Sequence, residues 1–186
     1  GLAAAGVWFF RFQQQYAEEQ VAAQLTVVAQ LKMDEILRWR AERLADAGVI
    51  MDTPLLAAAV DRWLQEPNDQ NERPIRETLD AVRRNYGYSD VLIADPSGRV
   101  LLSGAAGGAG GGLHPEAARA VFRALRERRS VFEDLHLDPK GLKPHVGVAA
   151  PILRREGETP EPLAVVLLQS EADRFLYPLV QSWPVP

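Results

Sequence analysis

The chain has 186 residues, of which 47% are hydrophobic and 25% are charged, so it can bury the core of one globular domain. Its net charge of −4 provides no basic surface for nucleic acid, and we expect no nucleic-acid partner. Cysteine is absent, which excludes disulfides, thiolate metal ligands and cysteine nucleophiles.

The first ten residues, GLAAAGVWFF, form an uncharged run that is followed by Arg11. A bilayer requires roughly 20 apolar residues, so this run alone is too short to span one. The aromatic residues around Arg11 are typical of the border where a membrane helix leaves the lipid. Two interpretations are open here: residues 1–12 are the end of a membrane helix, or they begin a helix that docks on a core or a partner chain.

A long helix is predicted from about residue 10 to residue 46, because this stretch lacks Pro and Gly and is rich in helix formers. Gly48 is placed to end it. One helix of this length cannot bury its apolar stripe alone. We therefore expect its first half to pack on a second copy of the chain and its second half to pack on the domain.

Two further helices are predicted after this one. The triplet Asp52-Thr53-Pro54 begins the first, because Asp and Thr cap helices and Pro suits the first turn. The polar residues 66–74 predict a loop. Apolar residues three and four positions apart from Ile75 onward then predict a third helix that ends at Gly87. Four aromatic side chains on the predicted helices are expected in the core: Trp39, Trp63, Tyr86 and Phe122.

Five strands are predicted in the second half of the chain. Residues 91–94 and 100–102 flank Asp95-Pro96-Ser97-Gly98 and predict a β-hairpin, with Gly98 at positive φ. A helix begins at His114-Pro115, and strands follow at residues 131–137, 145–153 and 163–169. Short turns join these strands, so the sheet is antiparallel. The predicted fold class is α+β: a PAS-like five-stranded antiparallel sheet flanked by helices, with a long N-terminal helix.

The glycine-rich tract GAAGGAGGG (residues 104–112) does not form a phosphate-binding motif. A P-loop requires Lys and then Ser or Thr after its last Gly, but here Leu113 and His114 follow. No register of the tract matches G-x-G-x-x-G, and the preceding strand belongs to a hairpin rather than to a parallel crossover. The tract is therefore expected to be a flexible surface loop.

Polar side chains gather on the strand at residues 131–137 and at the start of its neighbour. Because alternate residues of a strand share a face, Asp134 and His136 are expected to point the same way as Phe132. His145 begins the next strand. Asp134, His136 and His145 could supply three ligands of a hydrolytic zinc site. They could equally line a small-molecule pocket, or have only structural roles.

Five segments, taken in this order, resemble the Cache class of extracytoplasmic sensor domains of bacterial transmembrane receptors. They are WRAERLADAGVI (39–50), YGYSDVLIADPSGRVLLS (86–103), FEDLH (132–136), PHVGVAAPI (144–152) and FLYPLVQSWPVP (175–186). The resemblance covers roughly residues 20–186. It implies a single sensor domain at residues 13–182, with residues 1–12 leaving one membrane helix and residues 183–186 leading to a second. The Arg-x-Trp-Tyr run of the amino-acid-binding subgroup is missing, so amino-acid specificity is not implied.

The resemblance also implies a role. The domain would lie on the periplasmic or extracellular face of the bacterial inner membrane and bind a small molecule. It would be a homodimer through its N-terminal helix and would signal to a cytoplasmic output domain, a kinase or a cyclase for example. The domain itself is expected to be no enzyme and to hold no cofactor. The candidate ligand-binding residues are Tyr88, Phe132, Asp134, His136, His145 and Arg43. The alternatives are a metal-dependent hydrolase using Asp134, His136 and His145, and a ligand-free dimerisation module.

Overall fold

The computed structural model describes residues 2–105, 110–137, 143–154 and 160–182. They form one five-stranded sheet in the order β2-β1-β5-β4-β3, and all neighbouring strands are antiparallel. The strands are β1 (Asp90–Ala94), β2 (Val100–Ser103), β3 (Val131–Leu137), β4 (Pro144–Arg154) and β5 (Glu161–Glu171). The predicted α+β, PAS-like sheet is confirmed.

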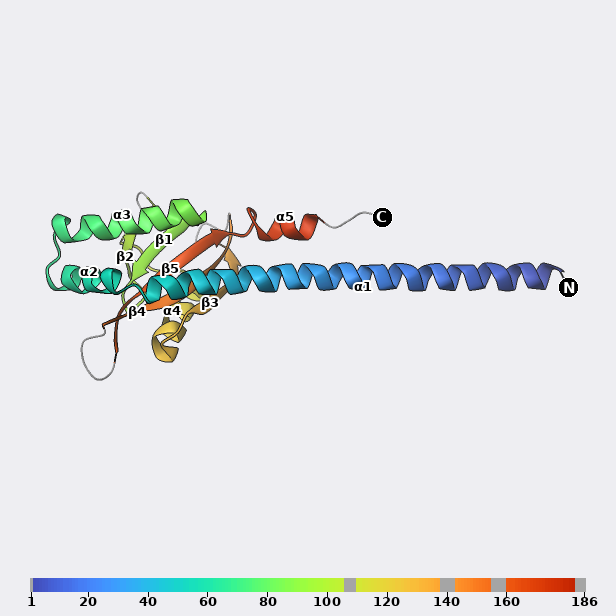
Figure 1. Ribbon diagram of the computed structural model, residues 1–186, viewed down its shortest axis with the longest axis horizontal. Coiled ribbons are helices and arrows are strands. Elements are labelled where there is room, and N and C mark those ends of the chain that lie inside the picture. Colours follow the sequence, from blue (N-terminus) through green and yellow to red (C-terminus); the bar gives the residue numbers. More distant parts are fainter. Residues whose placement is uncertain (1, 106–109, 138–142, 155–159, 183–186) are drawn as a thin grey trace.

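Helices cover both faces of this sheet (Figure 1). The C-terminal part of α1 (Leu2–Met51), α2 (Pro54–Gln65) and α3 (Asp69–Tyr86) pack on one face, here called the α1 face. The helix α4 (Pro115–Glu127) packs on the other, here called the α4 face. The N-terminal part of α1 extends far beyond the sheet, and the short α5 (Leu176–Gln181) lies beside α1.

The two faces hold separate cores because side chains alternate along each strand. On the α1 face, Ile93, Val148 and Leu168 meet helix residues such as Leu79. On the α4 face, three fully buried alanines of α4 allow the helix to approach the sheet closely: Ala117, Ala120 and Ala124. The sheet therefore separates an apolar helical layer from a thinner layer under α4.

The predicted hairpin is confirmed and its turn is held by Asp95. The Asp95 carboxylate accepts hydrogen bonds from the backbone N–H of Ser97 at 2.8 Å and of Arg99 at 3.0 Å. Gly98 has φ +85°, the left-handed conformation that closes the turn. These contacts hold the carboxylate in its charged form and lower the pKa of Asp95, although its partial burial acts in the opposite direction.

Two of the helix boundaries differ from the prediction, and one short helix is additional to it. The helix α1 continues through Gly48 to Met51, because Gly only weakens a helix and tertiary packing of this end compensates. The helix α3 begins at Asp69 and contains Pro74, so most of the predicted loop at residues 66–74 is helical. An Asn68 side chain caps it by accepting from the Asn71 N–H at 2.9 Å. The helix α5 was not predicted.

Two predicted segments fall partly or wholly outside the described residues. These are the centre of the glycine tract, residues 106–109, and the predicted exit at residues 183–186. Residues 2–12 are helical and belong to α1. Within the described ranges, none of the helices combines the length and the apolar character that a membrane span requires.

Candidate functional site

The sheet divides the six predicted ligand-binding residues into two groups. Arg43, Tyr88 and Phe132 lie on the α1 face, where Tyr88 and Phe132 contact the core of that face. Asp134, His136 and His145 lie toward α4. The two groups cannot line one pocket, because the strands and their hydrogen bonds lie between them.

A β-bulge in β3 determines this division. Glu133 pairs with Gly147 and His136 pairs with His145, so β3 has one residue more than β4 between these pairs. Strict alternation ends there. The prediction that Asp134 and His136 share the face of Phe132 is therefore wrong. Instead Glu133 and His136 both point under α4, while Phe132 packs on the other face.

Glu133 is the most unusual side chain under α4. It is fully buried, and neither carboxylate oxygen has a hydrogen-bond partner among the described residues. Burial, together with the nearby carboxylates of Glu116 and Asp134, raises the pKa of Glu133 to about 7. Glu133 is not among the predicted site residues, although strand alternation places it on the same face as the buried Val131.

Three histidines form a cluster in which His136 lies beside this carboxyl group. The ring of His114, the N-cap of α4, stacks on His136 with centroids 4.5 Å apart and planes 17° apart. His145 follows at 6.3 Å from His136. Burial lowers the pKa of His136, so its neutral form is favoured. His114 joins this cluster because α4 begins there, which a sequence pattern alone did not indicate.

The neutral forms of Glu133 and His136 are chemically complementary. The Nδ1 atom of His136 lies 3.0 Å from the Asp134 carbonyl oxygen, so in the tautomer that donates this bond Nε2 is an acceptor. Nε2 lies 3.5 Å from Oε1 of Glu133. A protonated Glu133 can therefore approach Nε2 as a donor. The arrangement can hold a proton or a hydrogen-bonding ligand group.

The same geometry does not favour a metal. Stacked rings direct the nitrogen lone pairs of His114 and His136 along parallel planes rather than toward one point. Over the ranges that the structure describes, no group of three or more His, Cys, Asp or Glu residues is placed to hold a metal ion. The metal-hydrolase alternative gains no support from these residues.

Asp134 lies at the outer edge of the cluster and lines a surface hollow of about 430 Å³ between α4 and β3. Glu116, Arg119 and Arg123 contribute the other charges of the hollow. Arg119 donates to Glu116 at 2.7 Å and Arg123 donates to the Phe132 carbonyl at 3.0 Å. The hollow thus presents both guanidinium and carboxylate groups to solvent.

Two of the four aromatic residues expected in the core are half-exposed. Phe122 forms an apolar wall of the hollow, and Tyr86 lies beside Tyr88 at the end of α3. The prediction of core positions is wrong for these two, because helical spacing places residues on one stripe without showing how far the partner surface extends. Trp63 is buried as expected, and Trp39 is half-buried.

On the α1 face, Asp46 bonds to both Tyr88 and Arg43, while the buried Nε of Arg43 has no hydrogen-bond partner among the described residues. The buried Tyr88 hydroxyl donates to Oδ2 of Asp46 at 2.9 Å, and Arg43 pairs with the same oxygen at 3.2 Å. Burial, together with the bond to Asp46, raises the pKa of the Tyr88 hydroxyl. Phe132 meets Trp39 edge to face at a centroid distance of 5.8 Å. These contacts join α1 to the sheet.

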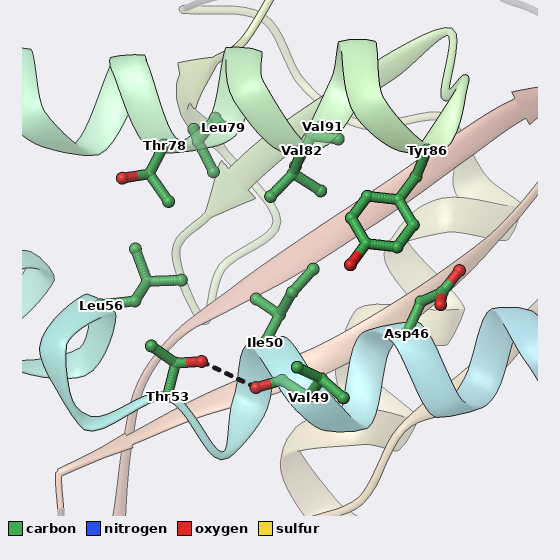
Figure 2. Close-up of a pocket in the computed structure, with 10 residues that line it drawn as sticks. All are labelled: Asp46, Val49, Ile50, Thr53, Leu56, Thr78, Leu79, Val82, Tyr86 and Val91. Atoms are coloured by element: carbon green, nitrogen blue, oxygen red, sulfur yellow. Dashed lines mark hydrogen bonds between the residues drawn. The ribbon is translucent and has the colours of Figure 1, made fainter.

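An apolar cavity of about 170 Å³ lies close to this group, between the end of α1 and α3 (Figure 2). Val49 and Ile50 of α1 face Leu79 and Val82 of α3 across it. Val91 of β1 forms part of its floor. It is separated from the Glu133 cluster by the sheet.

No family model matches the chain, and no curated protein matches it. Solved structures do. The Vibrio cholerae histidine kinase DctB sensor domain is 14% identical with a TM-score of 0.71, over 90% of this chain and 60% of that one. The ligand-binding domain of the Campylobacter jejuni chemoreceptor Tlp3, in complex with 4-methylisoleucine, is 15% identical with a TM-score of 0.62, over 84% and 60%. The Escherichia coli DcuS sensor domain is 17% identical with a TM-score of 0.54, over 76% and 94%.

The fold is therefore that of bacterial sensor domains. It is the Cache-type fold that the five sequence segments resemble. The chain spans about 60% of the length of the DctB and Tlp3 chains that it matches.

Proposed function

We propose that this chain is the extracytoplasmic sensor domain of a transmembrane receptor, which reports a small molecule to a cytoplasmic output domain. The observation that carries the proposal is the fold, shared over 90% of the chain with a histidine kinase sensor domain. The domain itself performs no chemistry in this proposal, and its output is a change in the position of its terminal helices.

The ligand site that we favour is the hollow on the α4 face together with the cluster beneath it. Arg119 and Arg123 offer donors for a carboxylate, and Asp134 offers an acceptor for an amine. The buried Glu133 and His136 lie next to this surface and respond to a charge placed there. The expected ligand is a small polar molecule that carries both charges or a strong dipole.

The predicted ligand-binding residues on the α1 face are not part of the ligand site in this proposal. Tyr88 contacts Asp46 and Arg43 of α1, and Phe132 contacts Trp39 of α1, so these residues connect the sheet to α1. We assign them to transmission of the ligand state rather than to contact with the ligand. A ligand can shift α1 only if it binds one arrangement of the sheet and helices better than another.

Membrane anchoring and dimerisation belong to the same proposal. The extended part of α1 exposes many large apolar side chains, among them Trp8, Phe12, Leu25 and Leu31. A second copy of α1 would cover the middle of this helix, and residues 1–12 would lead from a membrane helix.

A thermal-shift screen of small polar molecules tests the ligand site. A ligand well above its dissociation constant is expected to raise the melting temperature by several degrees. Arg123→Gln and Asp134→Asn should remove that shift, whereas Arg129→Gln, which changes an exposed arginine outside the hollow, should retain it.

Two outcomes would contradict the proposal. An equal rise of the melting temperature in all variants would show that the ligand binds outside the hollow. Absence of any stabilising molecule would favour the ligand-free dimerisation module. Fractionation of the full-length receptor tests the extracytoplasmic location separately. A cytosolic position of this segment would contradict that part of the proposal.

A further inference from the structure

The cavity between α1 and α3 lies on the α1 face, so it is distinct from the proposed ligand site on the α4 face. It lies between the last turns of α1 and the second half of α3, as Figure 2 shows. Its floor is fully apolar and buried: Leu56, Leu79 and Val91 are at most 6% exposed. Its mouth is formed by Val49, Thr78 and Tyr86, which are exposed. The cavity thus has a closed apolar base and access from solvent.

The volume of the cavity is that of a small ligand. Protein interiors rarely contain voids larger than a water molecule. An engineered apolar cavity of about 150 Å³ stays dry and binds benzene. At about 170 Å³, the cavity here has room for a single aromatic ring or a branched alkyl group of similar size. A longer or fused-ring molecule would not fit without movement of α1 or α3.

The polar groups around the cavity do not favour an anionic ligand. Asp46 is the one charged residue of the lining, and its Oδ2 atom is already bonded to Tyr88 and Arg43. Thr53 and Thr78 donate their hydroxyls to helix carbonyls, to Val49 and Pro74 respectively, each at 2.8 Å. No unpaired cation in the lining is available to hold an anion.

One polar group at the mouth is available to a ligand. The Tyr86 side chain points into the space between α1 and α3 (Figure 2), and its hydroxyl has no hydrogen bond to a described residue. A ligand with a single hydroxyl or carbonyl group could bond to it, while the rest of the ligand fills the apolar base.

We propose that this cavity binds a small uncharged molecule, a single aromatic ring or a branched alkyl group with at most one hydrogen-bonding substituent. Because the walls belong to α1 and α3, an occupant fixes the end of α1 against α3. This site is independent of the ligand proposed for the α4 face, and each can fail without the other.

Toluene and benzoate are suitable probes, because they share the ring and differ in charge. In the 186-residue chain, saturating toluene is expected to raise the melting temperature by about 2 °C or more. It should also shift the methyl NMR signals of Val49, Val82 and Val91. Benzoate at the same concentration should do neither. No response to toluene, or an equal response to benzoate, would overturn the proposal.

A cavity-filling variant locates the response. Val82→Phe places a ring in the cavity and should abolish the toluene shift. The same substitution on the exposed part of α1, Val27→Phe, should retain it. If Val82→Phe does not give a folded protein by circular dichroism, Ile50→Phe fills the same space from α1. Retention of the toluene response in a folded cavity-filling variant would place toluene elsewhere and overturn the assignment.

Discussion

The backbone of Gly147 and the carboxylate of Glu133 meet across β4 and β3, so closely that a Cβ atom on Gly147 would lie 2.6 Å from Oε2 of Glu133. The same Cβ would lie 2.6 Å from the Leu168 carbonyl oxygen on β5. The buried carboxyl group therefore occupies space that only a glycine on the neighbouring strand leaves open.

Gly147→Ala should destabilise the domain by about 1–3 kcal/mol, because neither the backbone of β5 nor the buried Glu133 can move away easily. Urea unfolding measures the difference. Gly48→Ala is the matched control, since a Cβ at Gly48 meets nothing within 4 Å and Ala favours the helix. Equal stability of Gly147→Ala and the unmodified chain would show that the close packing around Glu133 relaxes.

Glu133 should make stability depend on pH. Its pKa is about 7 in the folded chain and its ordinary value is 4.5, so the folded state binds this proton more tightly than the unfolded state. The contribution of Glu133 to the free energy of unfolding is therefore fully present below about pH 4.5 and is lost as the pH rises to about 7. Glu133→Gln should therefore be more stable than the unmodified chain at about pH 8, by roughly 3 kcal/mol, and similar to it at about pH 4.5.

His136 has the opposite effect, because its lowered pKa causes a loss of stability as the pH falls below about 6.5. Both Glu133→Gln and the unmodified chain contain His136, so the difference between them isolates the effect of Glu133. Unfolding curves at several pH values provide the measurement. Glu19→Gln, which changes an exposed residue of α1, is the control and should follow the unmodified chain. A constant difference between Glu133→Gln and the unmodified chain at all pH values would contradict the assignment.

Trp39 should be important for the contact between the two ends of the domain. Its ring stacks on Phe175 with centroids 4.7 Å apart, and α1 is bonded to the end of α5 by Lys32 and Ser182 at 2.9 Å. Trp39→Ala should cost about 2 kcal/mol of stability. Trp8→Ala, at a position 68% exposed, should change stability by less than about 0.5 kcal/mol. Similar unfolding midpoints for the two variants would argue against a structural role of the stack.

The exposed apolar residues of α1 should mediate self-association if the proposed homodimer forms. Leu25→Glu combined with Leu31→Glu places like charges along the helix and should convert a dimer to a monomer. Leu55→Glu, a change at an exposed apolar residue of α2, is the control and should leave the dimer intact. Analytical ultracentrifugation measures the mass, and a monomeric unmodified chain at high concentration would contradict dimerisation through α1.

Much of the fold could be predicted because its signals are local. The strand β3 was predicted with its observed limits, and the turn at Asp95 and the start of α4 at Pro115 were predicted from turn and cap residues. Helix ends were less predictable, since Gly48 and Pro74 both lie inside helices. Packing against the domain stabilises these turns, and that contribution is not visible in a local pattern.

The candidate site was only partly predictable. Asp134, His136 and His145 were selected as polar residues on neighbouring strands, and the structure places them in one region. His136 was assigned to the face of Phe132, which is the wrong face, and His114 was treated as a local helix residue. Both errors have one cause, since the bulge in β3 and the position of α4 result from contacts between distant segments.

The sequence by itself determined the order and type of the described elements other than α5, because hydrophobic period, caps and turn residues act over a few positions. It also determined the absence of disulfides and of phosphate-binding motifs. Only the tertiary structure decided which side chains meet. The pairing of β3 with β4 shifts register by one residue after Glu133, and that shift turns His136 to the same side as Glu133, under α4. A one-residue shift reverses side-chain direction, so the site depends on strand pairing that no short segment specifies.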